Sequence, residues 1–287
     1  MAELSPPADL VRRIADALDR LAPAAPGPAD ATAHPAYVWH DGSLVPTRHF
    51  APLPLALLTG IDAQKQAVHT NLTRLARGQA AHDVLLWGAR GTGKSALVKS
   101  AVADLQASAA ALALVEIPPH ALDTLPRLFA AIDGAARGFA LFVDDLAFDL
   151  PAQGRALRSM LEGGAEARPP NARFFVTSNR RHLMPRDMAA QASAINPRDT
   201  ADDELALADR FGLSLGFHVV DQDSYLAMVR GYAQALGLPF DADDALQWAT
   251  QRGARSGRVA WHYAVELAGR NGRGIDAAAW SVNHVSA

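Results

Sequence analysis

Residues 83–95 read DVLLWGARGTGKS, and they are the strongest indication of fold in the sequence. DVLLW (83–87) has the continuous apolar character of a buried strand, and SALVKSAVADL, from Ser95, has the rhythm of an amphipathic helix. Between them, residues 88–95 fit the pattern G-x-x-x-x-G-K-[ST]. In such a loop the glycines let backbone N–H groups surround an anion, and the following helix adds its positive end. The stretch predicts a phosphate-binding loop.

The residues of this loop have different expected roles. Lys94 is expected to reach the β- and γ-phosphates of a nucleotide, and the Ser95 hydroxyl to ligate Mg²⁺. The other predicted nucleotide-binding residues of the loop are Gly88, Ala89, Arg90, Gly91, Thr92, Gly93 and Ala96. The alternative is a glycine-rich loop with a chance lysine, which average residue frequencies allow in roughly one chain of this length in a hundred. The strand and helix on either side favour a site for ATP and Mg²⁺.

Further strand-like runs alternate with helical patterns along the chain. The runs are DVLLWG (83–88), ALALVEI (111–117), FALFVDD (139–145), ARFFVTSN (172–179) and FGLSLGFHVV (211–220). Continuous apolar strands separated by helices are typical of a parallel sheet covered on both faces. After residue 220 the strands stop, and helical patterns follow that end near Gly237, Gly253 and Gly269. The sequence predicts an α/β P-loop fold: a three-layer sandwich with a parallel five-stranded sheet, followed by a small all-helical lid domain.

The first fifty residues look like an appendage to this core. Residues 8–21 have a helical rhythm, 22–35 are rich in proline and alanine, and 36–46 carry a D-G turn between two apolar arms. The expected domains are 1–52 (helix, linker and hairpin), 53–220 (P-loop domain) and 221–287 (helical lid).

Composition excludes several classes of function. The chain has no cysteine, so disulfides and thiolate metal sites are excluded, and its histidines show no H-E-x-x-H spacing, which predicts no zinc. A net charge of -3 provides no global basic field for nucleic acid. The N-terminus lacks the apolar core of a secretory signal, and no apolar run approaches the length of a membrane span. We therefore expect a soluble, cytoplasmic protein without a membrane partner.

Two adjacent carboxylates, Asp144 and Asp145, end the apolar run FALFV. In P-loop proteins a second strand ends in an Asp that holds Mg²⁺, which is the role expected for Asp144. Asp145 beside it is then positioned to orient or deprotonate the attacking water as a general base. The alternative is that the pair caps the next helix. A cap explains one Asp in a loop, but it does not explain two beside a predicted phosphate site.

The order of these segments resembles that of the AAA+ ATPases. GARGTGKS, FVDD, FVTSN, LADRFG and SGRVA follow one another over residues 88–260. The segments GIDAQK, LLWGARGTGKS, SMLEGGAEARP, TSNRRHLMPRDM, DRFGLSL and SGRVAWHYA resemble more closely a bacterial family of predicted AAA+ ATPases that is known as a domain of unknown function. This resemblance covers about residues 36–270.

The resemblance implies roles for four more residues. Asn179 matches the sensor 1 position, which places water near the γ-phosphate, although it could simply end a strand in a turn. Arg210 matches the arginine finger offered to a neighbouring subunit, although it could instead pair on the surface with Asp209. Arg258 matches sensor 2, with Arg252 and Arg255 as rivals. Ile61 matches a contact to adenine.

One position departs from the AAA+ pattern. Most AAA+ hydrolases have Glu where this chain has Asp145. The shorter side chain places its carboxylate about 1.5 Å farther back, and a misplacement of that size can lower a rate on the order of 10²-fold. Either the backbone compensates for the shorter side chain, or the protein is a slow hydrolase that acts more like a switch.

Together these features predict an ATP-binding AAA+ protein that hydrolyses ATP with Mg²⁺ to remodel or switch an unidentified macromolecular partner. A trans-acting Arg210 implies a homo-oligomer, and an unidentified protein partner is expected as well. The first alternative is a nucleotide-dependent binding module, such as a loader or adaptor, with little turnover. A small-molecule P-loop kinase is the second, against which the lid and Arg258 argue. A DNA-dependent ATPase is the third; only a short basic cluster at residues 180–186 offers it a contact.

Overall fold

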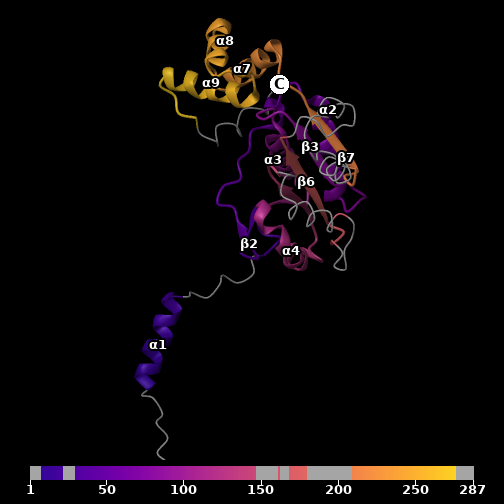
Figure 1. Ribbon diagram of the computed structural model, residues 1–287, viewed down its shortest axis with the longest axis vertical. Coiled ribbons are helices and arrows are strands. Elements are labelled where there is room, and N and C mark those ends of the chain that lie inside the picture. Colours follow the sequence, from indigo (N-terminus) through magenta and orange to yellow (C-terminus); the bar gives the residue numbers. More distant parts are fainter. Residues whose placement is uncertain (1–7, 22–29, 147–160, 162–167, 180–208, 276–287) are drawn as a thin grey trace, which may run out of the picture.

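The computed structural model describes residues 8–21, 30–146, 161, 168–179 and 209–275. It contains a sheet flanked by helices and a separate group of helices, α7, α8 and α9, beside it (Figure 1). The basic cluster at residues 180–186 lies outside the described residues. None of the helices that the structure describes combines the length and the apolar character needed to cross a membrane.

The described strands form a seven-stranded sheet in the order β2-β1-β4-β5-β6-β3-β7. Their bounds are β1 (Ala36–His40), β2 (Ser43–Pro46), β3 (Val84–Gly88), β4 (Leu112–Glu116), β5 (Gly138–Val143), β6 (Ala172–Ser178) and β7 (Leu213–Phe217). The strands β4, β5, β6, β3 and β7 pair in parallel, which confirms the predicted five-stranded parallel sheet as the centre of the fold. Two further strands extend it.

The two additional strands are the N-terminal hairpin. Asp41 and Gly42 both have positive φ, +48° and +71°, which is the geometry of a type I′ turn. β1 pairs in parallel with β4 and antiparallel with β2. Trp39 is buried, and its indole N–H donates to Thr124 Oγ1 at 2.8 Å. Residues 36–46 are therefore part of the sheet instead of an appendage to it, while the domain boundaries at 52 and 220 stay predictions.

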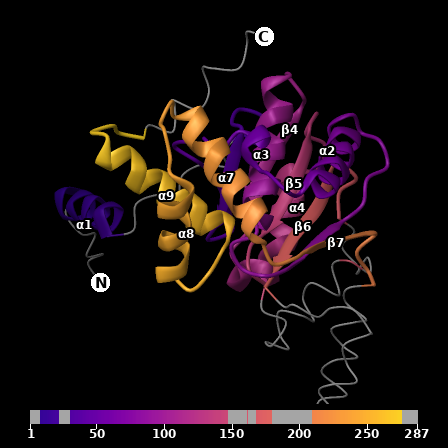
Figure 2. The ribbon, with the colours of Figure 1, turned by 90° about the horizontal axis from the view of Figure 1, so that it is seen from above.

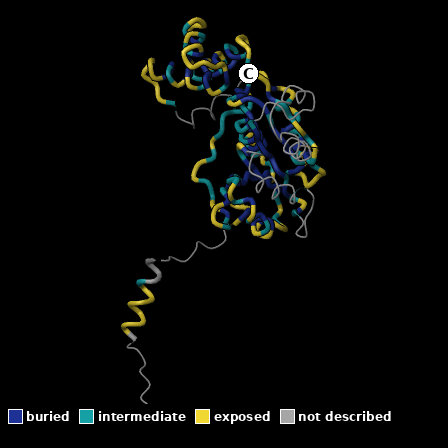
Figure 3. Tube along the Cα trace, in the orientation of Figure 1, coloured by how far each residue is buried: buried dark blue, intermediate teal, exposed yellow. Residues whose placement is uncertain are grey.

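Helices cover both faces of the sheet, and the strands between them are largely buried (Figure 3). The buried side chains form a separate cluster on each face. The helices are η1 (Leu55–Leu57), α2 (Asp62–Ala76), α3 (Lys94–Ala107), η2 (Pro119–Thr124) and α4 (Leu125–Ile132). Leu128 of α4 and Leu141 of β5 belong to the core on one face, whereas Leu97 of α3 and Phe142 of β5 belong to the core on the other. Neighbouring residues of β5 face opposite layers because strand side chains alternate. This gives the predicted three layers.

The described part of the lid contains three helices, each with a side-chain cap at its N-terminus. They are α7 (Gln222–Ala235), α8 (Ala242–Gln251) and α9 (Gly257–Arg270). The Asp221, Asp241 and Ser256 side chains accept from backbone N–H groups of the following first turns. Such caps satisfy donors that a helix start leaves unpaired. Seen from above, the lid lies beside the sheet (Figure 2).

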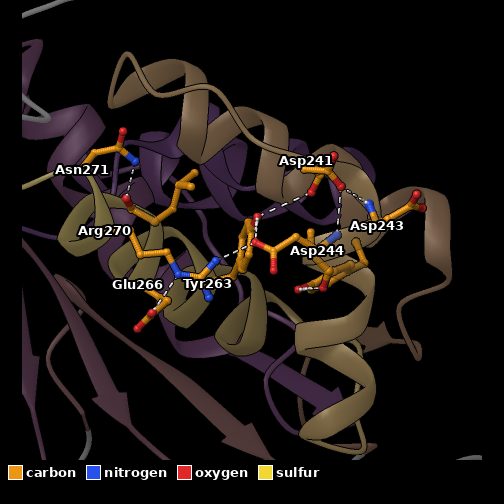
Figure 4. Close-up of polar contacts among 10 residues, drawn as sticks. Asp241, Asp243, Asp244, Tyr263, Glu266, Arg270 and Asn271 are labelled. Carbon is orange, nitrogen blue, oxygen red and sulfur yellow. Dashed lines mark hydrogen bonds and ion pairs between the residues drawn. The ribbon is translucent and has the colours of Figure 1, made fainter.

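A polar network joins two of the lid helices (Figure 4). The Tyr263 hydroxyl donates to Asp244 Oδ2 at 2.9 Å, and Arg270 Nη1 lies 2.8 Å from the same oxygen. Arg270 Nε also donates to Glu266 Oε1 at 2.9 Å. Burial and the hydrogen bond to Asp244 raise the pKa of Tyr263 far above its usual range. This network lies on the lid and ties α8 to α9.

At the N-terminus, α1 (Ala8–Leu21) lies away from both the sheet and the lid in Figure 1. Its side chains Leu10, Val11 and Ile14 are about half exposed.

Candidate functional site

The candidate site is a cavity of about 530 Å³ at the carboxyl ends of the central strands. β3 leads into the glycine loop, β5 into the carboxylate pair, and β6 into Asn179. Because the carboxyl ends of parallel strands meet at one edge of a sheet, segments far apart in sequence converge there. The lid closes the other side through residues of α7 and α9.

The glycines of the loop are required by space and by conformation. A Cβ on Gly88 would lie 2.1 Å from the Phe217 carbonyl oxygen, so no side chain can pass β7 there. Gly91 and Gly93 have φ of +75° and +95°, which L side chains rarely adopt. α3 begins at Lys94, directly after the last loop glycine, and the Leu97 N–H donates to the Gly93 carbonyl at 2.8 Å. The start of this helix therefore faces the cavity.

Lys94 lies at the floor of the cavity, with only 6% of its surface exposed. Its Nζ donates to the carbonyl oxygens of Gly88 and Ala89, at 3.0 and 2.8 Å, and to Asn179 Oδ1 at 3.0 Å. Burial lowers the pKa of Lys94, and this effect outweighs the carboxylates of Asp145 and Asp144, which raise it. A partly desolvated ammonium group is stabilised by an anion placed against it.

Ser95 and Asp144 are directly bonded. Ser95 Oγ donates to Asp144 Oδ1 at 2.6 Å, and Thr177 Oγ1 donates to the same oxygen at 2.6 Å. The Thr177 hydroxyl also accepts from the Asp145 N–H at 2.8 Å. Thr177 therefore orients both carboxylate residues from the neighbouring strand. The sequence pattern did not single it out, although a polar residue directly after the apolar run FFV was the available signal.

Asp145 has a left-handed backbone, with φ of +51°. Its Oδ1 accepts from Asn179 Nδ2, and its Oδ2 lies 3.9 Å from Arg90 Nη2. The side chain is 56% exposed, so the pair with Arg90 is solvent-screened. Because Asn179 also accepts from Lys94, one amide joins the predicted phosphate ligand to the predicted base. Asp is among the few residues that tolerate this backbone region.

The donor set fits Mg²⁺. In the described part of the chain no three His, Asp or Glu side chains converge as an all-protein cage. Ser95 and Asp144 instead offer hard oxygen atoms at one point of the cavity. Mg²⁺ is usually held in this way, by one or two protein oxygens together with phosphate oxygens and water.

Arg258 enters the cavity from the lid, at the first turn of α9. The helix starts against the glycine loop: a Cβ on Gly91 would lie 2.9 Å from Ser256 Oγ. Of the two rivals, Arg252 lies over the Trp248 ring at 3.3 Å, and Arg255 is exposed and is not among the cavity-lining residues. The second helix N-terminus at the cavity therefore carries Arg258.

The other half of the cavity is apolar. Its lining side chains are Leu53, Leu57, Leu58, Ile61, Met228, Tyr232 and Trp261. Tyr232 and Trp261 meet edge to face, with ring centroids 5.5 Å apart, and burial raises the pKa of Tyr232 to about 12. Of this set the sequence predicted only Ile61. The lid residues were missed because a helical pattern shows which side chains share a face but not what that face meets.

Arg210 is not brought to this cavity. It precedes β7, whose first residue, Leu213, pairs with Val84 at the amino end of β3. The glycine loop begins four residues after Val84, at Gly88. The amino end of β3 is therefore separated from the loop by roughly 13 Å of strand. An arginine side chain at the opposite end of the strands does not reach the cavity of the same chain.

Solved structures share this architecture. A single-residue variant of RuvB from Thermotoga maritima aligns with a TM-score of 0.50 and 16% identity, covering 81% of this chain and 71% of that chain. Orc1 of Aeropyrum pernix, solved with DNA, aligns with a TM-score of 0.53 and 15% identity, covering 79% and 68%. At such identities the likeness shows the fold alone, which is the nucleotide-binding P-loop fold of the AAA+ ATPases.

No curated protein sequence matches the chain. A family model does: the one described as "Protein of unknown function (DUF815)" matches residues 32–271. Because this match spans most of the chain, the protein belongs to that family.

Proposed function

We propose that this protein binds ATP with Mg²⁺ in the cavity and hydrolyses it to remodel or switch a macromolecular partner. The observation that carries the proposal is the bond from Ser95 Oγ to Asp144 Oδ1 beside the buried Lys94. Two oxygen atoms of the kind that Mg²⁺ prefers therefore lie beside a buried ammonium group near one helix N-terminus, where anions are favoured.

The shape of the cavity suits a nucleotide. Its volume, about 530 Å³, lies within the usual range for small-molecule sites, about 300–1,000 Å³. The phosphates would lie over residues 90–96, and the base would enter the apolar half between Ile61 and the ring pair Tyr232 and Trp261. One polar end and one apolar end match the two ends of ATP.

The cavity residues would have different roles in hydrolysis. Lys94 and Arg258 would hold the phosphate oxygens from the loop and from the lid. Asp145 and Asn179 would position the attacking water, with Asp145 accepting its proton. Ser95 and Asp144 would hold Mg²⁺, which would neutralise the charge that develops on the phosphates. Asn179 must then exchange its bond to Asp145 for contacts with the water and the phosphate.

The position of Arg210 supports action in trans. Since it lies at the opposite edge of the sheet, it would act only on the nucleotide of a neighbouring copy, and the working form would be a homo-oligomer. The macromolecular partner is proposed to be a protein in the cytoplasm. A net charge of -3 adds no support for a nucleic-acid partner.

A second candidate is a nucleotide-dependent binding module with little turnover. The bond between Asp145 and Asn179 favours it, because the predicted base is engaged by a neighbouring side chain. A single-turnover assay at high protein concentration separates the two. Phosphate release supports a hydrolase, whereas tight ATP binding without release supports the switch.

The proposal is tested by calorimetric titration of ATP, with and without Mg²⁺, into wild type, Lys94→Ala, Ser95→Ala and Lys99→Ala. Lys99 is the matched control, since it lies on the same helix but pairs with Glu116 at 2.8 Å, away from the cavity. We expect Lys94→Ala to weaken binding by about tenfold or more, since a charged hydrogen bond is worth about 1.5–3 kcal/mol. Lys99→Ala should bind normally.

In the same titrations Mg²⁺ should tighten ATP binding to wild type but not to Ser95→Ala. Equal affinities for all four proteins, or no measurable ATP binding by wild type, would overturn the proposed function.

A further inference from the structure

The segment that carries Arg210 is fixed at the amino end of β7. Phe211 is only 5% exposed and belongs to the core on the α4 side of the sheet. The Leu213 N–H donates to the Asp83 carbonyl at 3.2 Å, which joins the start of β7 to the residue before β3. Arg210 thus sits directly beside a buried anchor, at an edge where its backbone has little freedom.

Gly212, two residues after Arg210, lies close against His82. A Cβ placed on it would lie 2.3 Å from His82 Nδ1, 2.9 Å from His82 Cγ and 3.2 Å from His82 Cβ. Its φ lies outside the left-handed region, so glycine is needed here for space and not for conformation. Any side chain must displace either the His82 ring or the backbone that leads to Arg210.

His82 is in turn held by a buried amide. Asn71 of α2 is 3% exposed; its Nδ2 donates to the His82 carbonyl at 2.9 Å, and its Oδ1 accepts from the His82 N–H at 2.9 Å. Both backbone groups of His82 are satisfied by one side chain, which fixes the position of its Cα. The contacts run from α2 through residue 82 to Gly212, and so to Arg210.

We propose that Asn71, His82 and Gly212 are positioning residues for Arg210. They fix its backbone in the position from which its side chain reaches the nucleotide of a neighbouring subunit. This inference rests on the proposed trans role of Arg210. A displacement of about 1 Å can lower a rate on the order of 10²-fold, and a trans arginine is worth about 10³–10⁵ in turnover. None of the three residues lines the cavity, so their effect should appear in turnover and not in ATP affinity.

The first test compares Gly212→Ala with Gly269→Ala in the whole 287-residue chain. Gly269 lies on α9 with no neighbour near its would-be Cβ, so it controls for adding a methyl group. We expect Gly212→Ala to lower the rate of phosphate release about tenfold with an unchanged ATP dissociation constant. Adding His82→Ala to Gly212→Ala should restore most of the rate, because it removes the atoms that collide. Normal turnover by Gly212→Ala, or no recovery in the double variant, overturns the inference.

The second test separates positioning from a general structural defect. Gly212→Ala subunits are mixed with an excess of Lys94→Ala subunits, which lack a working cavity but still offer Arg210. If Gly212 acts through Arg210, the mixture regains turnover, because a Gly212→Ala cavity now receives an intact arginine from its neighbour. If turnover stays low, the defect lies in the variant's own cavity and the inference is wrong.

Arg210→Ala is carried through both tests. If it loses no turnover, the proposed trans role fails, and the positioning inference fails with it. If Arg210→Ala loses turnover but Gly212→Ala does not, only the positioning inference is wrong. If Gly212→Ala does not fold, Asn71→Asp is measured in its place. This variant keeps one of the two hydrogen bonds to His82. It should also lower turnover without affecting ATP affinity, and normal turnover by this variant would count equally against the inference.

Discussion

At the scale of single residues, the backbone explains why two Asp residues stand side by side. Asp145 has a φ of +51°, a region that Asp and Asn tolerate far better than longer side chains do. The Thr177 hydroxyl accepts from its N–H and also binds Asp144, so this backbone position is fixed from β6. The shorter side chain of Asp, compared with Glu, is therefore matched to the conformation at this position.

Replacing Asp145 should separate stability from activity. A non-glycine residue in this region costs about 1 kcal/mol or more. Asp145→Gly should therefore leave the free energy of unfolding unchanged or raise it, by up to about 1 kcal/mol. The same variant should abolish phosphate release. Asp145→Glu should not increase turnover, because Glu is less suited to φ of +51°. Urea unfolding and a phosphate assay measure both quantities. Faster turnover by Asp145→Glu would contradict the backbone argument.

At the scale of elements, two helix N-termini meet at the cavity. α3 starts at Lys94 from the glycine loop, and α9 starts at Gly257 from the lid. The cap of α9, Ser256, packs against Gly91, so the lid and the loop are in direct contact. Both helices direct the positive ends of their dipoles toward the region where the phosphates are proposed to lie.

The caps of α8 and α9 offer a matched pair of variants. Ser256→Ala and Asp241→Ala each remove a side-chain cap, and each should lower the free energy of unfolding by about 1 kcal/mol. Of α8 and α9, only α9 starts at the cavity. We therefore expect Ser256→Ala, but not Asp241→Ala, to weaken ATP binding as well, by about threefold to tenfold. Thermal unfolding and ATP titration of both variants check this. Equal ATP affinities would show that the start of α9 has no part in binding.

At the scale of the whole molecule, the lid has a core of its own. Tyr225, Val229 and Tyr263 are buried in it, and η1 contributes Leu57 as the link to the sheet. Burial raises the pKa of Tyr225 and that of Tyr232 to about 12. The cores on the two faces of the sheet contain neither of these tyrosines, so alkaline pH acts on the two parts differently.

The lid should therefore unfold first at high pH. An unfolded tyrosine loses its proton near pH 10, whereas these two retain theirs in the folded state to about pH 12. Between these values the unfolded chain binds fewer protons, so the free energy of unfolding falls as pH rises, by up to roughly 3 kcal/mol for each tyrosine.

Tryptophan fluorescence can follow this transition. Trp248 and Trp261 report on the lid, while Trp39 and Trp87 report on the sheet. Single-tryptophan variants should show the lid signal changing at lower pH than the sheet signal, and Tyr225→Phe should move the lid transition to higher pH. Coincident transitions for both parts would contradict a separate lid.

Features that depend on neighbouring residues could be read from the sequence. The glycine loop, the D-G turn and the starts of the lid helices are set by the local demands of φ, hydrogen bonding and apolar periodicity. The sequence also marked Asp144, Asn179 and Arg258, and the structure brings all three to the cavity that Lys94 and Ser95 line. Strand ends in a parallel sheet converge, so local pattern and fold class together were sufficient for these positions.

Tertiary structure alone decided the rest. Four features join segments that are far apart in sequence. They are the pairing of the hairpin with β4, the bonds from Thr177 to the carboxylate pair, the ring pair at the apolar half of the cavity, and the contact of Gly212 with His82. A sequence pattern states which face of a strand or helix is buried, but not which surface covers it. The chain's sequence therefore determined a P-loop fold with its loop and carboxylates. Only packing decided which side chains orient them and where Arg210 stands.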